Sequence, residues 1–472
     1  MIRDVDSFYD VIKKHSQTTP DSVAIVDHSQ QLTYQQLQDN IDQRHTWLTE
    51  HIGEQSLVGL KFSATIWHVV TYLACFKAGV PMLILDAQIS DNDAIKQANN
   101  IGANKFIGDN KLIITLKNTP TVTRSDLAIL LSTSGSTGAA KSIMLSQQNL
   151  LSNAKSINQY LPMTAKDTGI ASLPLSYSYG LSLLNSHLSI GARFVLTTES
   201  LISKTFWQLM ADYQVTSLAG VPFSYQMLKR LKFEKMDLPA LTYLTQAGGK
   251  LSADLVEYFY QITQQTQRKL YVMYGQTEAS ARIAYLPPCF LPEYSDCIGI
   301  AIPDGKLILR DLNNGSVITQ PHVKGELCYQ GPNVMLGYAI NQDDLNSHKS
   351  LTELKTGDVA ELTSNGLIKI SGRLNRILKI QGKRFSLDHI EQILHQHTQT
   401  ACYCFGEDDK LMIAIPSHID IAIIKQFCSQ QFNLHPSLFY IIQLDDIPRF
   451  SSGKPNYLQL MQLAKQRQKH VV

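Results

Sequence analysis

The sequence LSTSGSTGAAKS, at residues 131–142, is the most informative stretch of this 472-residue chain. An apolar run at 127–131 favours a buried β-strand, and the residues after it are small or hydroxyl-bearing, with one cation, Lys141. Small residues let backbone N–H groups approach an anion, hydroxyls add donors, and a lysine neutralises charge, so the pattern predicts a phosphate-binding loop. Two alanines separate Gly138 from Lys141, which is not the spacing of a Walker A loop. A Ser/Gly linker is the alternative, but we expect a second strand and a helix capped by Ser146 to follow directly.

Length and composition predict a globular protein of two or more domains. The chain is 44% hydrophobic and 17% charged, and no apolar stretch reaches the ~18 residues that span a bilayer. Its N-terminal residues MIRDVDSFYD carry acids where a signal peptide has a basic start, so we expect a cytoplasmic protein. Seven scattered cysteines without a Cys-x-x-Cys pair argue against a disulfide framework and a structural zinc site.

The net charge of +2 is unevenly distributed along the chain. From Gly372 onward there are 12 Lys/Arg and 8 Asp/Glu residues, without interleaved aromatic residues. This pattern disfavours a nucleic-acid partner and is better suited to a polyanionic small molecule or an acidic protein.

Strand and helix patterns alternate along the first 280 residues, which predicts parallel α/β sheets covered by helices. Between 298 and 340, short β-like pieces separated by Gly, Asn and Pro predict a small barrel or curled sheet. The pattern changes again at 356–384. We therefore predict an N-terminal domain of residues 1–372 and a small α+β domain of residues 373–472.

A second polar motif, YGQTE at 274–278, follows the apolar residues of an expected strand. Tyr274 offers a ring to a flat base, Thr277 a donor to a phosphate oxygen, and Glu278 a carboxylate to a hard cation. The alternative is an ordinary strand end at which Thr277 caps a helix.

Two further motifs carry charged side chains in expected turns. TGD at 356–358 places Asp358 where its carboxylate can accept two hydrogen bonds from a ribose diol, and Arg373 can contact a ribose or a phosphate. SSGKPN at 451–456 places Lys454 in a glycine-flanked loop. Each of these motifs alone is also typical of a surface turn.

The order of these motifs resembles the adenylate-forming superfamily, which includes acyl- and aryl-CoA synthetases, adenylation domains of nonribosomal peptide synthetases, and luciferases. The resemblance covers nearly the whole chain. Besides the phosphate loop it rests on TTPDSVAIVDHSQQLTYQQLQDNI at 18–41, QAGGKL at 246–251, YGQTE, GELCYQGPNVMLGY at 325–338, TGD, GRLNRILKIQGKRF at 372–385 and SSGK at 451–454.

The resemblance implies a large N-terminal domain of α/β subdomains plus a small β-barrel, joined to a small, mobile α+β C-terminal domain. It also implies a two-step reaction. A carboxylate attacks the α-phosphorus of ATP and expels pyrophosphate, and a thiol then attacks the acyl-adenylate and expels AMP.

By resemblance, the site residues can be assigned to each part of the reaction. The β- and γ-phosphates would be held by Thr133, Ser134, Gly135, Ser136, Thr137, Gly138 and Lys141. The α-phosphate would contact Thr277, Mg²⁺ would bind Glu278, and the adenosine would be framed by Gly248, Gly249, Tyr274, Asp358 and Arg373. Lys454 would bridge the carboxylate and the α-phosphate in the first step. The hinge and the thiol path would involve Asn375, Lys379 and Gly382, with Lys383 and Arg384 near phosphates of CoA or of a carrier's pantetheine.

Four positions depart from the family pattern. Ala140-Lys141-Ser142 replaces the usual Pro-Lys-Gly, which we expect to alter only the stiffness of the loop. Asn375 stands where the hinge usually carries Asp or Lys, which we expect to leave adenylation intact and to affect the rate of domain alternation. SYSYG, with Tyr177 and Tyr179, replaces a motif that often holds a His. Ser178 stands where relatives that activate amino acids place an Asp.

The expected acid pocket is apolar. It would be formed by Tyr177, Ser178, Tyr179, Val221 and Ala247, with Leu183 and the Gly248-Gly249 pair nearby. An ammonium group buried there without a carboxylate partner would be costly, so α-amino acids are disfavoured and an acyl or aryl acid is expected. Arg282 has two interpretations: it binds a second carboxylate of the substrate, or it forms a structural ion pair.

The leading hypothesis is therefore an AMP-forming acid–thiol ligase that makes an acyl-CoA. Fatty acyl, aryl and dicarboxylic aromatic acids such as o-succinylbenzoate remain open. A stand-alone ligase that loads an acyl carrier protein is the first alternative. A luciferase-like oxygenase has no residue that specifically supports it. A catalytically degenerate protein that binds nucleotide or acid is the non-enzyme alternative, and the retention of the charged motif residues argues against it.

Overall fold

The chain divides into two compact units, which are described separately. The first consists of residues 1–307 and 329–354, and the second of residues 308–328 and 355–472. The domain boundary expected at 372/373 remains a prediction. The computed structural model describes residues 7–53, 56–108, 111–118, 123–132, 141–348, 351–380, 383–407, 409–432, 434–450 and 454–469.

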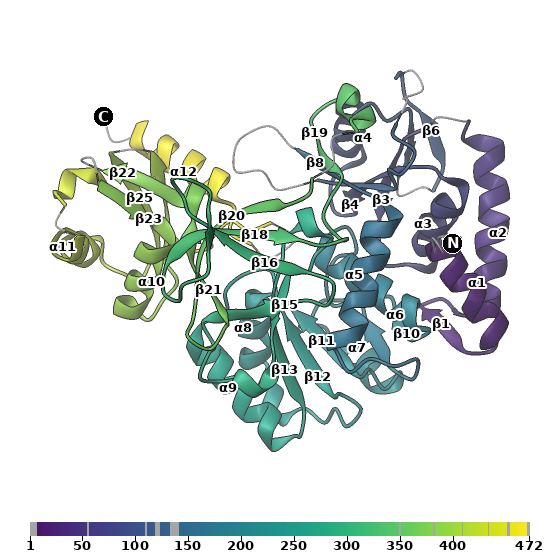
Figure 1. The fold of residues 1–472 in the computed structure, drawn as a ribbon, viewed down its shortest axis with the longest axis horizontal. Helices are drawn as coiled ribbons and strands as arrows, with labels where there is room; N and C mark the ends of the chain where they lie inside the picture. Colours follow the sequence, from purple (N-terminus) through teal and green to yellow (C-terminus); the bar gives the residue numbers. More distant parts are fainter. Residues whose placement is uncertain are drawn as a thin grey trace. The chain divides into compact units, whose positions relative to one another are not determined.

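The first unit contains a seven-stranded sheet in the order β19-β8-β7-β4-β3-β5-β6 (Figure 1). Its strands β7, β4, β3 and β5 run parallel, and all five residues of β3 are buried, as expected for strands covered on both faces. The strands are β3 (Val58–Phe62), β4 (Met82–Asp86), β5 (Lys105–Ile107), β6 (Ile113–Thr115), β7 (Ile129–Ser132), β8 (Ser142–Leu145) and β19 (Gly337–Ala339).

Two more groups of strands complete the sheets of the first unit. A four-stranded sheet has the order β2-β1-β10-β9, and β11, β12 and β13 are parallel neighbours followed by antiparallel β14 and β15. The strands are β1 (Val23–Val26), β2 (Gln31–Thr33), β9 (Thr168–Ile170), β10 (Arg193–Val195), β11 (Ser217–Gly220), β12 (Tyr243–Gln246), β13 (Lys269–Tyr274), β14 (Ala284–Leu286) and β15 (Cys297–Ala301). The alternating strand–helix pattern of the first 280 residues is thus confirmed as parallel α/β sheets.

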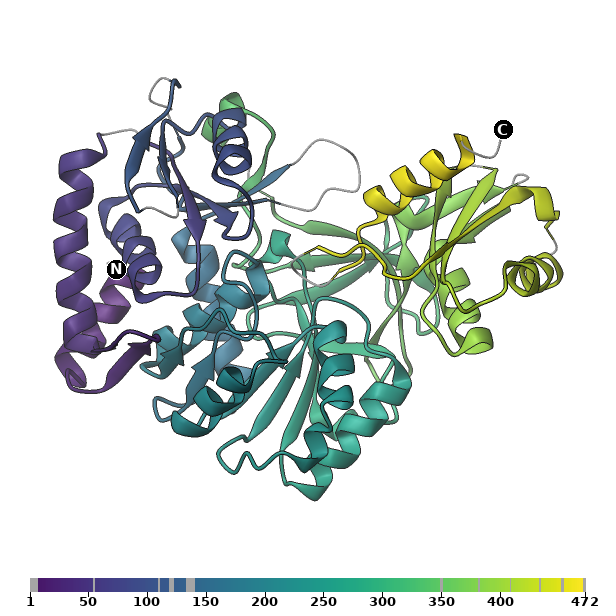
Figure 2. The same ribbon diagram turned by 180° about the vertical axis from the view of Figure 1, so that it is seen from behind.

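Helices cover these sheets. The α-helices are α1 (Phe8–Thr18), α2 (Tyr34–His51), α3 (Ile66–Ala78), α4 (Asp91–Asn100), α5 (Gln147–Tyr160), α6 (Ser178–Ile190), α7 (Lys204–Asp212), α8 (Pro222–Arg230) and α9 (Ala253–Gln265). Short 3₁₀ turns are η1 (Phe233–Lys235), η2 (Thr277–Ala279), η3 (Pro288–Phe290) and η4 (Gln342–Asn346). Helices α8 and α9 lie on the face of β11–β13 that is turned toward the viewer in Figure 2. Ser146 caps α5 with a reciprocal Ser–Asn capping box, which confirms the predicted helix start.

The second unit begins with strands in the open order β21-β20-β18-β16-β17, so the expected small β-barrel is not confirmed. A β22–β23 hairpin and a three-stranded sheet β24-β25-β26 follow. The strands are β16 (Lys306–Arg310), β17 (Val317–Ile318), β18 (Lys324–Gln330), β20 (Leu354–Leu362), β21 (Ile368–Arg373), β22 (Ile377–Ile380), β23 (Lys383–Ser386), β24 (Tyr403–Glu407), β25 (Lys410–Pro416) and β26 (Phe439–Leu444). The helices are η5 (Leu374–Arg376), α10 (Leu387–Thr398), α11 (Ile421–Phe432), η6 (Pro436–Leu438) and α12 (Tyr457–Lys469).

Apolar side chains of α10, α11 and the three-stranded sheet form a core of their own in this unit. Cys402, Cys404 and Cys428 are buried in it as small apolar residues. Within the described ranges, no helix combines the length and the apolar character needed to cross a membrane.

Candidate active site

The predicted phosphate loop connects two neighbouring strands. Residues Thr133, Ser134, Gly135, Ser136, Thr137 and Gly138 lie outside the described residues, so their role stays a prediction. The strands on either side, β7 and β8, pair antiparallel, with Leu131 opposite Ile143 and Ser132 opposite Ser142. The two ends of the loop therefore lie next to each other at one end of the β7–β8 pair. Lys141 lies at the C-terminal end of the loop.

Lys141 and Glu278 both lie beside Tyr338, a residue for which the sequence predicted no role. Strand β19 pairs with β8, which places Tyr338 opposite Ile143. The ammonium of Lys141 lies 5.5 Å from the centre of the Tyr338 ring, and the Tyr338 hydroxyl donates to Glu278 Oε1 at 3.0 Å. Burial, and then the Glu278 carboxylate, raise the pKa of Tyr338, so its hydroxyl stays protonated and remains a donor. The structure thus brings together two charged residues that are 137 positions apart in sequence.

The YGQTE segment lies in a tight loop after β13. Tyr274 ends the strand half-buried, and a side chain at Gly275 would place Cβ only 1.8 Å from the Ala281 carbonyl oxygen, so only glycine fits. Thr277 opens η2 but does not cap it: Gln276 is the N-cap residue and makes no side-chain cap bond. The Thr277 hydroxyl lies 3.1 Å from the hydroxyl of Ser178, which joins this loop to the start of α6.

Asn333 stabilises the same loop through hydrogen bonds to its backbone. Its amide nitrogen donates to the carbonyl oxygens of Ala279 at 2.7 Å and Arg282 at 2.8 Å, and its amide oxygen accepts from the Tyr329 hydroxyl at 2.8 Å. The Met335 N–H also donates to a carbonyl of this loop, that of Glu278, at 2.8 Å. Because Asn333 is only 2% exposed, these bonds are shielded from water and fix the backbone that carries Thr277 and Glu278.

The expected acid-pocket residues are brought together in part. Gly248 has a φ of +84°, and a Cβ built there would lie 3.0 Å from Val221 Cγ1 and 3.3 Å from the Tyr177 hydroxyl. The buried Ala247 N–H donates to the Gly220 carbonyl, which keeps this glycine turn next to Val221. Tyr177, Val221 and Gly248 therefore face one another, while a Cβ at Gly249 would approach the ring of Pro222 instead.

Tyr179 is buried beneath this surface. Its hydroxyl donates toward Thr245, with 3.0 Å to the carbonyl and 2.9 Å to the side-chain oxygen. The guanidinium carbon of Arg282 lies 4.0 Å from the centre of the Tyr179 ring. The structural ion pair that was one interpretation of Arg282 is not found with any described carboxylate; its charged group packs on an aromatic face instead.

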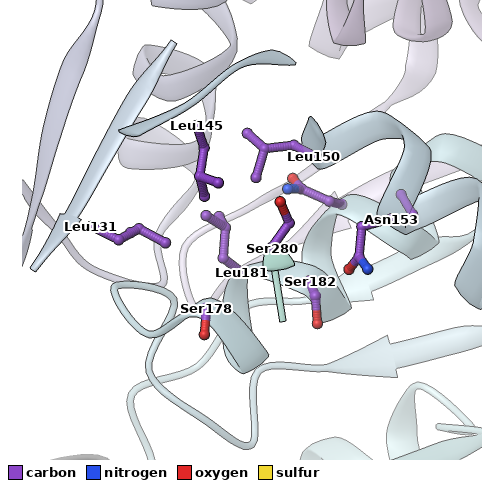
Figure 3. A pocket seen from close by; sticks show the side chains of 10 residues that line it. Leu131, Leu145, Leu150, Asn153, Ser178, Leu181, Ser182 and Ser280 are labelled. Atoms are coloured by element: carbon purple, nitrogen blue, oxygen red, sulfur yellow. The ribbon is translucent and has the colours of Figure 1, made fainter. Parts of the chain in front are cut away.

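A small cavity lies between β7, β8, α5 and α6 (Figure 3). Its volume is about 10 Å³, enough for one water molecule and too little for an acyl chain. The buried Asn153 Oδ1 in its wall has no hydrogen-bond partner among the described residues, which makes it a natural acceptor for such a water. The lining residues are Leu131, Leu145, Leu150, Asn153, Ala154, Ser178, Leu181, Ser182, Asn185 and Ser280.

In the second unit, the two predicted ribose ligands face each other across the β20–β21 pair. Asp358 lies opposite Arg373 in the strand register, and Arg373 Nε donates to Asp358 Oδ1 at 2.7 Å. The Asp358 side chain is 3% exposed and the Arg373 side chain 53%. The buried carboxylate is thus oriented by a guanidinium that is itself open to solvent.

Lys454 is half-buried and lies three residues before the start of α12. Its carbonyl accepts from the Phe450 N–H at 2.9 Å, and Arg449 forms an isolated bridge with Pro455. Residues 451–453 lie outside the described residues.

Arg376 connects the predicted hinge to the rest of this unit. It donates to Asp388 at 2.5 Å and to Glu391 at 2.7 Å, and its guanidinium lies 4.2 Å from the centre of the Tyr457 ring. The side chains of Asn375 and Lys379, and the whole of Gly382, lie outside what the structure describes, so the hinge and the thiol path stay predictions.

The chain resembles a known protein family and several known proteins. The family described as AMP-binding enzyme matches residues 12–119 and 109–339. An oxalate–CoA ligase of Arabidopsis thaliana is 24% identical over 96% of this chain and 97% of its own length. A long-chain-fatty-acid–CoA ligase of Escherichia coli O157:H7 is 26% identical over 71% of this chain and 61% of its own length.

A solved structure also resembles the chain over almost all of its length. It is the o-succinylbenzoate coenzyme A synthetase (MenE) of Bacillus subtilis in complex with AMP. It superimposes with a TM-score of 0.79 at 21% identity, over 96% of this chain and 98% of that one. At this level of identity the likeness concerns the fold.

Proposed function

The chain belongs to the AMP-binding enzymes of the adenylate-forming superfamily, and from that membership we propose that it activates a carboxylic acid with ATP, releases pyrophosphate and transfers the acyl group to the thiol of CoA. The reaction takes place in two steps, adenylation and thioester formation, and we place it in the cytoplasm.

The observation that carries this proposal is the group formed by Lys141, Tyr338 and Glu278 beside the Ser178–Thr277 pair. When a carboxylate attacks a phosphate of ATP, two anions must approach each other, so the main demand is charge neutralisation and in-line positioning. Lys141 supplies positive charge at the end of the phosphate loop, and the Thr277 hydroxyl offers a hydrogen bond to the reacting phosphate.

The residues present fit a magnesium ion that arrives with ATP. Mg²⁺ is bound through one or two carboxylates together with substrate phosphates and waters, and it neutralises phosphate charge when bound. Glu278 offers such a carboxylate, with one oxygen oriented by Tyr338. No cluster of three or more His, Cys, Asp or Glu side chains that could hold a metal ion occurs in the described parts of the chain. We therefore assign Glu278 to Mg²⁺, with phosphate oxygens completing its ligands.

The remaining roles follow the same assignment. Tyr274 and the Gly248–Gly249 turn frame the adenine, Asp358 and Arg373 hold the ribose, and Lys454 stabilises the charge that develops between the carboxylate and the α-phosphate. Asn375, Lys379 and Gly382 serve the alternation between the two steps and the entry of the thiol.

The acid is an acyl or aryl carboxylic acid. Tyr177, Val221 and Gly248 present a largely apolar surface, and Ser178, at the position where an aspartate would hold an ammonium, instead contacts Thr277. An α-ammonium would have no carboxylate partner at that position, which disfavours amino acids. The relatives named above act on an oxalate, a long-chain fatty acid and an o-succinylbenzoate, so their names do not single out one acid.

The test is pyrophosphate release with Mg-ATP across a panel of fatty, aryl and dicarboxylic acids, each assayed with and without CoA. We expect release with one chemical class, stimulated by CoA and accompanied by a thioester. Pyrophosphate release that does not change with CoA, together with a thioester formed on a pantetheinylated carrier protein, would identify a carrier protein as the acceptor instead of CoA. No release with any acid, while ATP still binds, would overturn the proposal in favour of a nucleotide-binding protein without turnover.

A further inference from the structure

Arg282 is a buried cation for which the described residues supply no anion. Its side chain is 1% exposed, and it is one of the largest fully buried side chains in the described parts of the chain. Its Nε and Nη1 atoms find no hydrogen-bond partner there, and no described Asp or Glu pairs with it. A guanidinium removed from water normally needs a hydrogen-bonded carboxylate or phosphate to offset the loss of hydration.

The two aromatic residues beside Arg282 do not neutralise its charge. The Tyr160 hydroxyl accepts a hydrogen bond from the guanidinium and donates to the sulfur of Met273, and the Tyr179 ring receives the guanidinium on its face. Burial raises the pKa of Tyr160 to about 12 and also raises that of Tyr179, so both phenols stay neutral at physiological pH. A ring face compensates only part of the hydration that a buried cation has lost.

The position of Arg282 connects it to the acid pocket. It packs on Tyr179, the residue between Ser178, which contacts Thr277, and Gly180 in the first turn of α6. Tyr179 is also close to Tyr225, whose buried hydroxyl has no hydrogen-bond partner among the described residues. Unsatisfied donors of Arg282 and Tyr225 therefore lie beside Tyr179, the residue next to the one that contacts Thr277.

We propose that Arg282 is a specificity residue for the acid, and that its guanidinium binds a second carboxylate at the distal end of a dicarboxylic substrate. This inference rests on the proposed function. The second carboxylate would accept from either Nε or Nη1, the two donors that the described protein leaves unsatisfied, and the Tyr179 ring would move along the guanidinium plane to admit it. A monocarboxylic acid of the same length would leave the cation without its partner.

The experiment compares matched acids that differ only in the distal carboxylate: hexanoate with adipate, and octanoate with suberate. For each pair, kcat/KM for pyrophosphate release is measured in the parent and in Arg282→Gln and Arg282→Lys. We expect the parent to prefer the dicarboxylic member, Arg282→Gln to lose at least tenfold of that preference, and Arg282→Lys to retain part of it because its charge remains.

Arg268 provides a matched control. It is a half-buried arginine of the same unit whose guanidinium donates to the carbonyls of Leu241 at 3.0 Å and Leu238 at 2.7 Å and lies over the Phe233 ring. Its partners lie outside the candidate site, so Arg268→Gln should lower the midpoint of thermal unfolding and leave the preference between paired acids unchanged.

Several outcomes would overturn the inference. One is a preference of the parent protein for the monocarboxylic member of each pair. This result would refute the inference even if Arg282→Gln does not fold. Another is an Arg282→Gln variant that loses activity on both members of each pair equally, which would make Arg282 a structural residue. Failure of the parent to release pyrophosphate with any acid would count against the proposed function instead. In that case, loss of thermal stabilisation by suberate in Arg282→Gln, relative to the parent, would still test the binding of the second carboxylate.

Discussion

Replacing Tyr338 by phenylalanine tests whether this residue orients the carboxylate that we assign to Mg²⁺. The change removes one hydrogen bond, 3.0 Å long, to Glu278 Oε1. Bonds to charged groups contribute about 1.5–3 kcal/mol when they are shielded, but Tyr338 is 43% exposed, so we take about 1 kcal/mol. Since 1.4 kcal/mol is a factor of ten, the Mg²⁺ concentration for half-maximal pyrophosphate release should rise about fivefold. The rate at saturating Mg²⁺ should stay close to that of the parent.

The chain offers a matched control for this experiment. Tyr258 donates its hydroxyl to Glu234 in an exposed pair between α9 and η1, which has the same chemistry outside the candidate site. Tyr258→Phe should leave the Mg²⁺ dependence unchanged, and stabilisation by Mg-ATP in thermal unfolding should weaken only in Tyr338→Phe. Equal Mg²⁺ curves for the two variants would refute the positioning role of Tyr338.

Three other perturbations separate chemistry from folding. Lys454→Ala removes the cation that we assign to the first transition state, so pyrophosphate release should fall by about 10²-fold while thermal unfolding still shows a folded protein; a full rate would contradict the assignment. Asn333→Ala removes three buried hydrogen bonds at about 1 kcal/mol each, so denaturant titration should show a loss of about 3 kcal/mol in the free energy of unfolding. His187 donates from Nδ1 to the Leu183 carbonyl, and burial lowers its pKa from 6.5 to about 4, so folding favours the neutral ring. The contribution of the neutral ring to the free energy of unfolding is complete above pH 6.5. It should be lost as the pH falls from 6.5 to 4, by about 3 kcal/mol. In unfolding measured from pH 7 to pH 4, His187→Gln should show a flatter dependence of this free energy on pH.

Local sequence patterns were sufficient to predict the helices and strands of the first 280 residues, but not to predict which distant strands pair with one another. The apolar run before the phosphate loop and the Ser146 cap predicted β7, β8 and the start of α5, because each depends on neighbours within a few residues. Strand β19 is different. It lies in the Gly- and Pro-rich segment that we assigned to a barrel, yet it pairs with β8 almost 200 positions earlier. A three-residue strand carries no periodicity that could reveal its partner.

The candidate site shows the same limit. Glu278 and Lys141 could be proposed from the sequence because a carboxylate after a strand and a lysine after a glycine-rich loop have recognisable chemistry. Tyr338 and Asn333 belong to a segment quoted in the family resemblance, but a phenol and an amide suggest no chemistry until their partners are known. Thr277 was weighed as a helix cap, and that reading is wrong because Gln276 occupies the cap position of η2. Cap chemistry is specified by residue type only once the start of the helix is fixed.

In the second unit, one half-buried hydrogen-bond network constrains how the predicted hinge can act. A single oxygen of Glu391 accepts from Arg376 at 2.7 Å, from the Cys404 N–H at 2.7 Å and from the Tyr457 hydroxyl at 3.0 Å. These bonds join the residue that follows hinge position 375 to the first residue of α12, three positions after Lys454. A rotation that begins before Arg376 would keep all three bonds and would move Tyr457, the first residue of α12, together with Arg376. A rotation that begins after Arg376 would break a charge-assisted bond that is only partly exposed to solvent, which is costly. The network therefore favours a hinge at or before position 375, where the family resemblance places it.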